Sequence, residues 1–577
     1  GGVVGALVLV IALPFIRPLL NQIAFPEVAA LALFGVLMVS ALSRGAMLKG
    51  LIGGLLGILL GTIGTSYISG LPRFDLGTLY LFDGLPLVPA TIGLFALPEL
   101  VDLTMRGQPV GISGSVSNRE VFRGVRYGLS RWRMTVRQSL FGVFLGAVPG
   151  IGAAVIDWLA YAFGIAFSKE KTSFGKGNLD GVLFAESAQN SKEAGQAIPT
   201  LAFGVPGGLQ WALVLVAMTI YGVHPGLTML ERDLDITMSI VVTLALGNLF
   251  VTLLGMAATG QLAKLTLIPF PLLAAVLLPV TFIAAFLNTF HWGDIATACA
   301  MFGLGMSMKW LGWPRPPLLL GFILGPIIEQ NLWPSVQLWG WGFLSRPLTV
   351  GLVIAAVVSV TFLTRSMNKE ASVATASPEV CGAPETGSTP AMAREEGRPA
   401  GTAALVDGPR DVRLPRLKFS WHWESIFPLV VLGMVVWSLI ETQTFRAAES
   451  RFLPTLTSLA LIPLLVLHVG VRAISSGEQG QIMDLGMRTG TGMDAVKKLV
   501  TALSWLAGFI FLVGLIGMPF ASIAFALSFG LTQVRLVGRH RLWGLLPGAI
   551  MAALIFLVFE RLMVIEWPAK IVLGWVG

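Results

Sequence analysis

Two apolar stretches of the chain are interrupted by Pro and Gly, the residues least suited to a helix interior. The first stretch, Phe144 to Phe163, contains Pro149-Gly150-Ile151-Gly152, and the second, Ile198 to Trp211, contains Gly204-Val205-Pro206-Gly207-Gly208. A half-helix that begins at such a break presents unpaired N–H groups and a partial positive charge, which favour an anion. We therefore predict that the two breaks face each other across a bound carboxylate. The alternative is that both are kinks of tightly packed helices.

Neutral polar side chains lie next to the second break and could orient a carboxylate or a hydroxyl group of the substrate by hydrogen bonds. These are Ser187, Asn190 and Thr200. The complete predicted substrate site is Pro149, Gly150, Gly152, Ser187, Asn190, Thr200, Gly204, Pro206, Gly207 and Gly208.

Asp157 lies within an apolar segment, where an ionisable group is costly and commonly marks a partner, a cavity or an ion path. We assign ion coupling to Asp157 and to Glu186, which lies in the polar connection between the breaks. A pairing role with a neighbouring helix is an equal alternative for Asp157. Arg73, Asp83 and Glu99 surround a Pro-rich apolar piece and are expected to be interface or capping residues.

Other chemistries find little support. The chain has no Gly-x-x-x-x-Gly-Lys-Ser/Thr loop for nucleotide phosphates and no His-Glu-x-x-His zinc motif, and its five histidines form no ligand spacing, so no metal site and no cofactor are predicted. Ser113 in Gly111-Ile112-Ser113-Gly114 is the one candidate nucleophile for a rival reading as a membrane-embedded enzyme or processing factor. A flexible loop explains that motif better, and a passive channel is disfavoured because broken helices suit occlusion.

The elements that position these residues must be membrane helices. Of 577 residues, 55% are hydrophobic and only 12% are charged, and the mean hydropathy is +0.79, whereas soluble domains carry about 25% charge. Apolar runs such as residues 240–258 and 267–287 approach the roughly 20 residues that a spanning helix needs. The fold class is therefore all-α: a polytopic helical membrane protein with broken, re-entrant-like helices.

The net charge of +8 arises from basic residues in short loops, which indicates membrane topology rather than nucleic-acid binding. The loop between Met105 and Gln138 holds seven arginines against a lone Glu120, so we expect it in the cytoplasm. The two cysteines, Cys299 and Cys381, suggest neither a disulfide framework nor a metal site.

Composition divides the chain into three parts. Residues 1–364 are almost continuous membrane sequence, residues 365–420 form a polar linker without apolar periodicity, and residues 421–577 hold a second, smaller set of apolar spans. Because the chain opens inside an apolar span without an initiator Met, we expect the first part to lack its N-terminal portion.

A weak internal repeat, expected to be of inverted topology, relates two segments of the first part. "LLGILLGTIG" (Leu55 to Gly64) resembles "LLLGFILGPI" (Leu318 to Ile327), and each carries a Gly-x-x-x-Gly pair. Repeats are common in secondary transporters. The alternative is that small-residue spacing reflects close helix packing alone.

Together these motifs resemble the TctA-type large membrane subunit of the tripartite tricarboxylate transporter family. The resemblance rests on "GTIGTSYISGLPRFDLGTLYLFDGLPLVPATIGLFALPEL", "VPGIGAAVIDWLAYAF", "FGKGNLDGVLFAESAQN", "IPTLAFGVPGG" and "HPG" in that order. The segment from about Ile426 more loosely resembles the TctB-type small subunit, through "FLPTLTSLALIPL" and "LVFERLMVIEWP".

The resemblance implies a multi-pass transporter of the cytoplasmic (inner) membrane that imports tricarboxylates or other carboxylates. It implies a periplasmic solute-binding protein as partner and coupling to a Na⁺ or H⁺ gradient. The expected contacts are this partner, the organic anion and membrane lipid, without nucleic acid; a homo-oligomer is left open.

Overall fold

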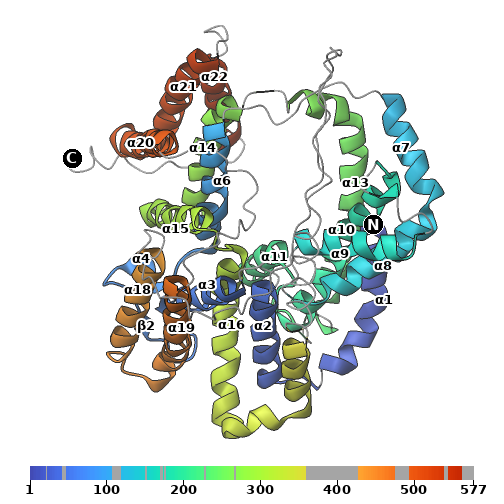
Figure 1. Ribbon diagram of the computed structural model, residues 1–577, viewed down its shortest axis with the longest axis vertical. Helices are drawn as coiled ribbons and strands as arrows, with labels where there is room; N and C mark the ends of the chain where they lie inside the picture. The colour runs from blue at the N-terminus through green and yellow to red at the C-terminus, as the bar shows by residue number, and fades with distance from the viewer. Residues whose placement is uncertain are drawn as a thin grey trace, which may run out of the picture.

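The computed structural model describes residues 1–20, 22–41, 47–106, 118–149, 153–168, 173–174, 177–226, 229, 231–265, 268, 270–358, 361, 426–474, 493–537 and 544–561. Almost all of this is helix, and the one sheet found there is a two-stranded antiparallel ribbon, which confirms the predicted helical membrane fold (Figure 1). The predicted linker 365–420, together with Ser113, Gly150 and Gly152, lies outside the described residues.

The elements up to the second break follow one another in this order: α1 (Gly2–Leu20), α2 (Phe25–Ala41), α3 (Met47–Leu60), β1 (Gly64–Thr65), β2 (Pro72–Arg73), α4 (Leu79–Phe82), α5 (Leu87–Thr91), η1 (Ile92–Ala96), α6 (Leu97–Arg106), α7 (Asn118–Ser130), α8 (Trp132–Gly146), α9 (Ala153–Ala166) and α10 (Leu179–Phe203). The elements after it are α11 (Leu209–Ile220), α13 (Leu234–Leu265), α14 (Phe270–Phe286), α15 (Trp292–Trp310), α16 (Pro316–Trp339), η3 (Gly340–Ser345), α18 (Ile426–Thr442), α19 (Ala448–Ile474), α20 (Met493–Ile516), α21 (Met518–Val537), α22 (Leu546–Ala553) and η6 (Leu554–Glu560).

Length and composition allow three helical segments of the described part to cross a membrane: Leu87–Thr104, Leu234–Lys264 and Ala448–Gly470. A fourth candidate is the pair Pro316–Ser345 and Pro347–Val358, which bends by 67° at the break between its helices. Most other helices are apolar but shorter. Short and bent apolar helices are the expected form of a bundle built from interrupted segments.

Helices α3 and α16, which carry the two copies of the weak repeat, pack directly on each other. A Cβ on Gly57 would lie 1.9 Å from the carbonyl oxygen of Leu318, and a Cβ on Gly321 would lie 2.0 Å from that of Gly54. The glycines therefore let the two backbones touch. The contact points move toward the C-terminus in both helices, so α3 and α16 are parallel. Helices related by an inverted repeat would be antiparallel, so inversion does not relate these two helices.

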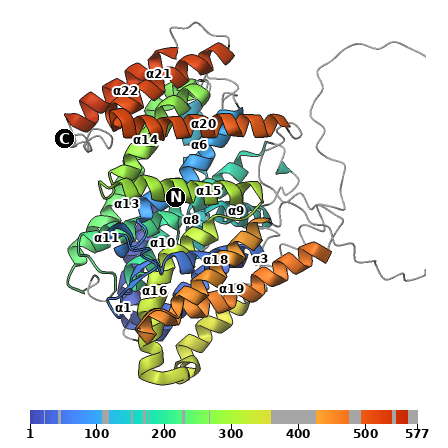
Figure 2. The ribbon, with the colours of Figure 1, turned by 90° about the vertical axis from the view of Figure 1, so that its left-hand side faces the viewer.

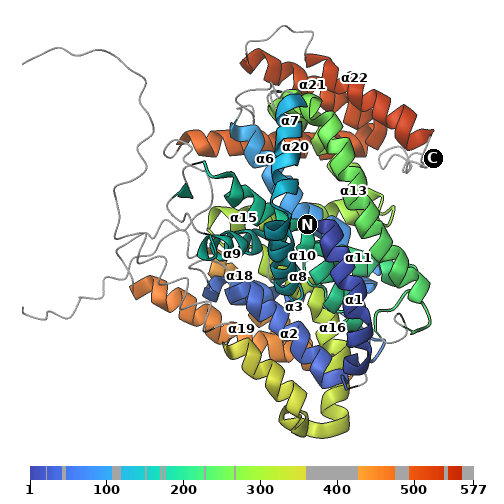
Figure 3. The ribbon, with the colours of Figure 1, turned by 90° about the vertical axis from the view of Figure 1, so that its right-hand side faces the viewer.

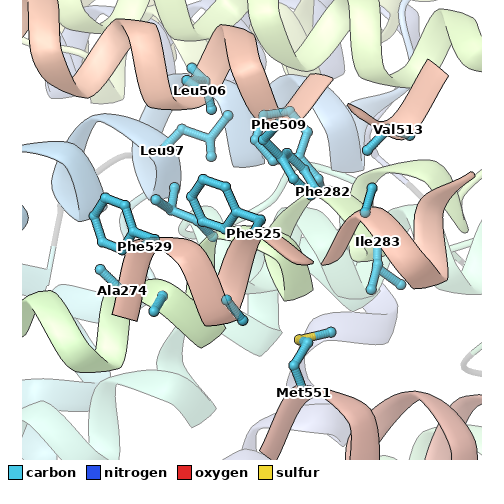
Figure 4. Packing of buried hydrophobic residues seen from close by; sticks show 14 of the residues in the cluster. Leu97, Ala274, Phe282, Ile283, Leu506, Phe509, Val513, Phe525, Phe529 and Met551 are labelled. Atoms are coloured by element: carbon cyan, nitrogen blue, oxygen red, sulfur yellow. The ribbon is translucent and has the colours of Figure 1, made fainter. Parts of the chain in front are cut away.

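The C-terminal helices contact two different parts of the first 358 residues. Helices α18 and α19 form a hairpin beside α3 and α16, whereas α20, α21 and α22 pack on α14 and α6 (Figures 1 and 2). The second contact is a shared apolar core in which Phe282 of α14 meets Phe509 of α20, and Phe509 meets Phe525 of α21 (Figure 4). A separate hydrophobic cluster joins α1, α10, α11 and α13 on another side of the molecule (Figure 3).

Candidate functional site

A cavity of about 1200 Å³ lies where α3, α10, α11 and α16 approach one another. Five parts of the chain form its wall: the start of α2, the segment from the end of α3 to the start of α5, the end of α10, the end of α11 with the turn after it, and the middle of α16. The polar lining residues are Thr65, Ser66, Tyr67, Asp83, Thr219, His224, Gln330 and Asn331.

The segment of residues 61–84, called the cavity loop below, is held in shape by its own backbone. Strands β1 and β2 pair Gly64 with Arg73, and the Thr65 hydroxyl donates to the Phe82 carbonyl at 2.8 Å. Gly64 has a φ of +105°, and a Cβ there would lie 2.5 Å from the amide nitrogen of Gly84. Only glycine satisfies both conditions, so Gly64 lets the two ends of the loop close together.

A buried ion pair ties the cavity loop to α16. The guanidinium of Arg73 donates to both carboxylate oxygens of Glu329, at 2.6 and 2.9 Å, and the Ser66 hydroxyl donates to Glu329 at 3.3 Å. Both charged side chains are almost fully buried. Because Gln330 and Asn331 directly follow Glu329, this pair sets the position of two lining amides relative to the loop.

The second predicted break forms one corner of the cavity. Helix α10 ends at Gly204, whose φ of +66° is the left-handed conformation of a helix C-cap, and Gly204 lines the cavity. The Gly226 amide donates to the Leu201 carbonyl at 2.9 Å, which brings His224 and Pro225 to the same wall.

The remaining glycines of that break serve packing. The Gly207 amide donates to the Thr200 hydroxyl at 3.2 Å. A Cβ on Gly207 or on Gly208 would come within 2.6 Å of an atom of Gln196. Val205 packs with residues of α2 and α16. The Gly207 amide is thus already used inside the protein.

Among the described residues, the cavity wall contains one carboxylate and helix ends of both signs. The last residues of α10 and α11, and the residues directly after α3, line it, and a helix C-terminus carries a partial negative charge. Pro326 inside α16 has no N–H, which leaves the Phe322 carbonyl without its helical donor, and both residues line the cavity. Asp83 adds a carboxylate, and none of the described lining residues is Lys or Arg. The start of α2, at Ile23 and Val28, and the start of α5, at Leu87, add the positive end of a helix dipole to the same wall. The wall therefore offers complementary charge to an anion and to a cation.

The first predicted break approaches α2 but does not reach the cavity in the described part of the chain. Pro149 lies beside Gly35, because a Cβ on Gly35 would be 3.6 Å from the Cβ of Pro149. Val148 packs in a cluster with Phe34 of α2, and Val205 of the second break packs on the same helix. Pro149 and Val205 thus meet one helix, and of the predicted substrate residues that the structure describes, Gly204 lines the cavity.

The three neutral polar residues lie along α10. Ser187 is buried against α8, where its carbonyl accepts from the Ser139 hydroxyl at 3.5 Å, and Thr200 is buried with its hydroxyl bonded to the Gln196 carbonyl at 2.7 Å. Asn190 is exposed on the side toward the start of α1. None of the three lines the cavity.

The predicted ion-coupling residues come together between α9 and α10. The charges of Glu186 and Lys192 both act on Asp157. One carboxylate oxygen of Asp157 is buried without a hydrogen-bond partner in the described structure. Lys192 is buried and forms an ion pair with Glu193. This polar seam is separate from the cavity lining.

The residues expected to cap or to form interfaces have more specific positions. Asp83 is the C-cap of α4 and also lines the cavity. Glu99 accepts from Lys309 at 2.8 Å and from Arg315 at 2.7 Å, and Lys309 also donates to the buried Asp102 at 3.0 Å. Arg73 therefore joins the cavity loop to α16, and Glu99 joins α6 to Lys309 of α15 and to Arg315 before α16.

Sequence reasoning missed most of the lining residues. The available signals were the Gly-Thr-x-Gly-Thr-Ser run that ends an apolar segment and the Glu329-Gln330-Asn331 run inside the mostly apolar α16. Polar residues that interrupt membrane helices commonly face an interior cavity.

Interrupted helices around a polar cavity, inside an apolar bundle, define the class of helical membrane transport proteins. The chain belongs to the tripartite tricarboxylate transporter TctA family, whose sequence model matches residues 1–320. The family assignment favours a transporter over the enzyme reading based on Ser113.

Two relatives from Agrobacterium vitis are similar to this chain. The "Uncharacterized 52.8 kDa protein in TAR-I ttuC' 3'region" is 29% identical over 341 residues, which cover 57% of this chain and 66% of that protein. The "Uncharacterized protein in TAR-II ttuC' 3'region" is 29% identical over 191 residues, covering 33% of this chain and 79% of the relative. The chain thus spans slightly less than two thirds of the first relative. No solved structure matches.

Proposed function

We propose that this chain provides the membrane pathway of an ion-coupled importer for small organic anions, tricarboxylates or other carboxylates, in the cytoplasmic membrane. The observation that carries the proposal is the cavity bounded by the end of α10, the cavity loop and the interrupted α16. A periplasmic solute-binding protein is the proposed donor of the substrate, as the tripartite family implies.

The size of the cavity suits a solute that binds together with an ion and water. Ligand pockets for drug-sized molecules measure about 300–1,000 Å³, and the cavity of about 1200 Å³ exceeds that range. Hydroxyl and amide groups at Thr65, Ser66, Gln330 and Asn331 can donate to carboxylate oxygens.

The wall also supplies a reason for ion coupling. Asp83 and three helix C-termini contribute negative charge to the wall, next to the positive starts of α2 and α5. A co-bound Na⁺ or a proton would neutralise part of this charge, so anion and cation would bind more tightly together than apart. One candidate acceptor is Asp83 in the cavity, and the other is Asp157 with Glu186 between α9 and α10.

Residues 421–577 are proposed to act as the small membrane subunit in the same polypeptide. The described helices α18–α22 support this proposal because they pack on the TctA-family part at two separate places. We retain the hypothesis that the first break, Pro149 to Gly152, faces the second break across the bound carboxylate; Gly150 and Gly152 lie outside the described residues.

Uptake by the purified chain in proteoliposomes, with the binding protein supplied outside, tests the proposal. Labelled citrate and dicarboxylates are offered with and without a Na⁺ gradient and a proton gradient. Gln330→Leu removes a lining amide and should raise the half-saturating substrate concentration at least tenfold, since a hydrogen bond to a charged group contributes about 1.5–3 kcal/mol. The matched control is Gln261→Leu on the exposed face of α13, which should change nothing. Equal effects of the two variants, or uptake indifferent to both gradients, would contradict the proposal.

A further inference from the structure

The α18–α19 hairpin contacts the cavity loop at the side chains that hold this loop in place. The Ser450 carbonyl of α19 accepts from Arg73 at 3.4 Å, and the hydroxyls of Ser69 and Ser450 are hydrogen-bonded at 2.6 Å. Ser450 is completely buried. The hairpin therefore supplies a third acceptor to the guanidinium that already binds Glu329.

Aromatic contacts close the same junction on both sides. Phe74, next to Arg73, lies edge-on to Phe445 with ring centroids 5.0 Å apart and is 6.0 Å from Trp437 of α18. On the other side, Trp333 of α16 packs against Phe452 of α19 at 5.1 Å. The hairpin thus contacts the residue next to Arg73 and, one helical turn after Glu329, Trp333 of α16.

Burial explains why the hairpin matters to this pair. A buried ion pair is stable only when its geometry is good and its remaining donors find acceptors. Without the hairpin, the Ser450 acceptor and the aromatic cover would be lost, and water would reach the guanidinium. The cavity loop would then be less firmly tied to Gln330 and Asn331.

We propose that the α18–α19 hairpin positions the substrate cavity: through Ser450 and Phe445 it holds residues 64–74 against α16 and so sets the affinity of the cavity for its ligand. The consequence for transport rests on the function proposed above, whereas the positioning itself does not. The hairpin belongs to the part of the chain after the linker, so this assigns a role in substrate binding to the proposed small-subunit part.

Amide hydrogen exchange of the purified full chain measures the positioning without any substrate. Ser69→Ala and Ser450→Ala each delete the same side-chain bond, so each should speed exchange of the amides in residues 64–73 about fivefold, the effect of one typical hydrogen bond. Ser69→Ala also removes the acceptor of the Leu71 amide at 3.4 Å. The double variant should therefore match Ser69→Ala and not exceed it, because both changes remove the one bond between Ser69 and Ser450. Phe445→Ala should produce a larger increase in the same amides. Ser458→Ala is the matched control, since Ser458 is also a buried serine of α19 but its hydroxyl has no partner in the described structure.

Uptake assays on the same variants separate positioning from general stability. Ser69→Ala and Ser450→Ala should raise the half-saturating substrate concentration severalfold, at unchanged maximal rate and unfolding temperature. Unchanged exchange in both Ser450→Ala and Phe445→Ala, or an equal increase in Ser458→Ala, would overturn the inference even where the wild type transports. Failure of the wild type to transport any carboxylate, with loop exchange still responding, would refute the proposed function and leave the positioning role intact.

Discussion

Arg73 and Glu329 lie 256 residues apart in sequence and form two charge-assisted hydrogen bonds of 2.6 and 2.9 Å inside the protein. The pair joins the cavity loop to α16. Removing one partner of a buried ion pair leaves the other charged and desolvated, which costs about 3–5 kcal/mol. The position of the cavity loop relative to α16 therefore depends on this ion pair.

Arg73→Met should lower the free energy of unfolding by about 3–5 kcal/mol, because Glu329 then stays buried without its partner. Arg131→Met is a suitable comparison, since Arg131 is half exposed and its ion pair with Asp180 is longer, at 3.6 Å. A surface pair of this kind contributes about 0–1 kcal/mol. Denaturant unfolding in detergent measures both. Equal losses in the two variants would show that the Arg73 pair is not specially costly to break.

Gly57→Ala should disrupt the packing of α3 on α16. A Cβ at Gly57 would lie 1.9 Å from a backbone carbonyl, so the helices must separate. We expect a loss of several degrees in unfolding temperature, and Gly303→Ala in α15, where nothing lies within 4 Å of the added Cβ, should be neutral or slightly stabilising. An unchanged unfolding temperature in Gly57→Ala would show that the backbones of α3 and α16 do not touch at Gly57.

Asp83→Asn and Asp157→Asn distinguish the two candidate cation sites. If the cation binds in the cavity, Asp83→Asn should remove most of the dependence of uptake on the ion gradient, while Asp157→Asn retains it. The reverse pattern would place coupling between α9 and α10. Uptake at several Na⁺ concentrations and external pH values measures the dependence, and two variants that both keep full coupling would exclude these carboxylates.

Lys309→Met should destabilise the contact between α6 and α15. Lys309 neutralises Asp102, whose side chain is 1% exposed, and shares Glu99 with Arg315. Its loss removes the ion pairs of Lys309 with Asp102 and Glu99, so we expect about 3–5 kcal/mol lower unfolding free energy. Lys309→Met combined with Asp102→Leu should recover part of that loss, because the uncompensated charge is then gone. A double variant no more stable than Lys309→Met would argue against this explanation.

The helices themselves could be predicted from the sequence. The expected C-terminal apolar runs coincide with α18–α22, and the break after Phe203 is where α10 ends. Composition alone determines this, because a chain with few charges must satisfy its backbone hydrogen bonds within helices once it lies in hydrocarbon. The Gly-x-x-x-Gly pairs likewise marked helices that approach closely, and α3 and α16 do so.

The location of the polar cavity depended on tertiary structure. The sequence showed that Gly204 would interrupt a helix and that Arg73, Asp83 and Glu99 were polar residues in apolar surroundings. It could not show that Arg73 would meet Glu329 or that Asp83 would share a wall with Asn331, because pairings across more than 200 residues follow from how helices pack. Local sequence determines where a membrane helix must form or break, through backbone hydrogen bonding and burial. Which of the resulting polar ends face a common cavity is decided by side-chain packing between distant segments.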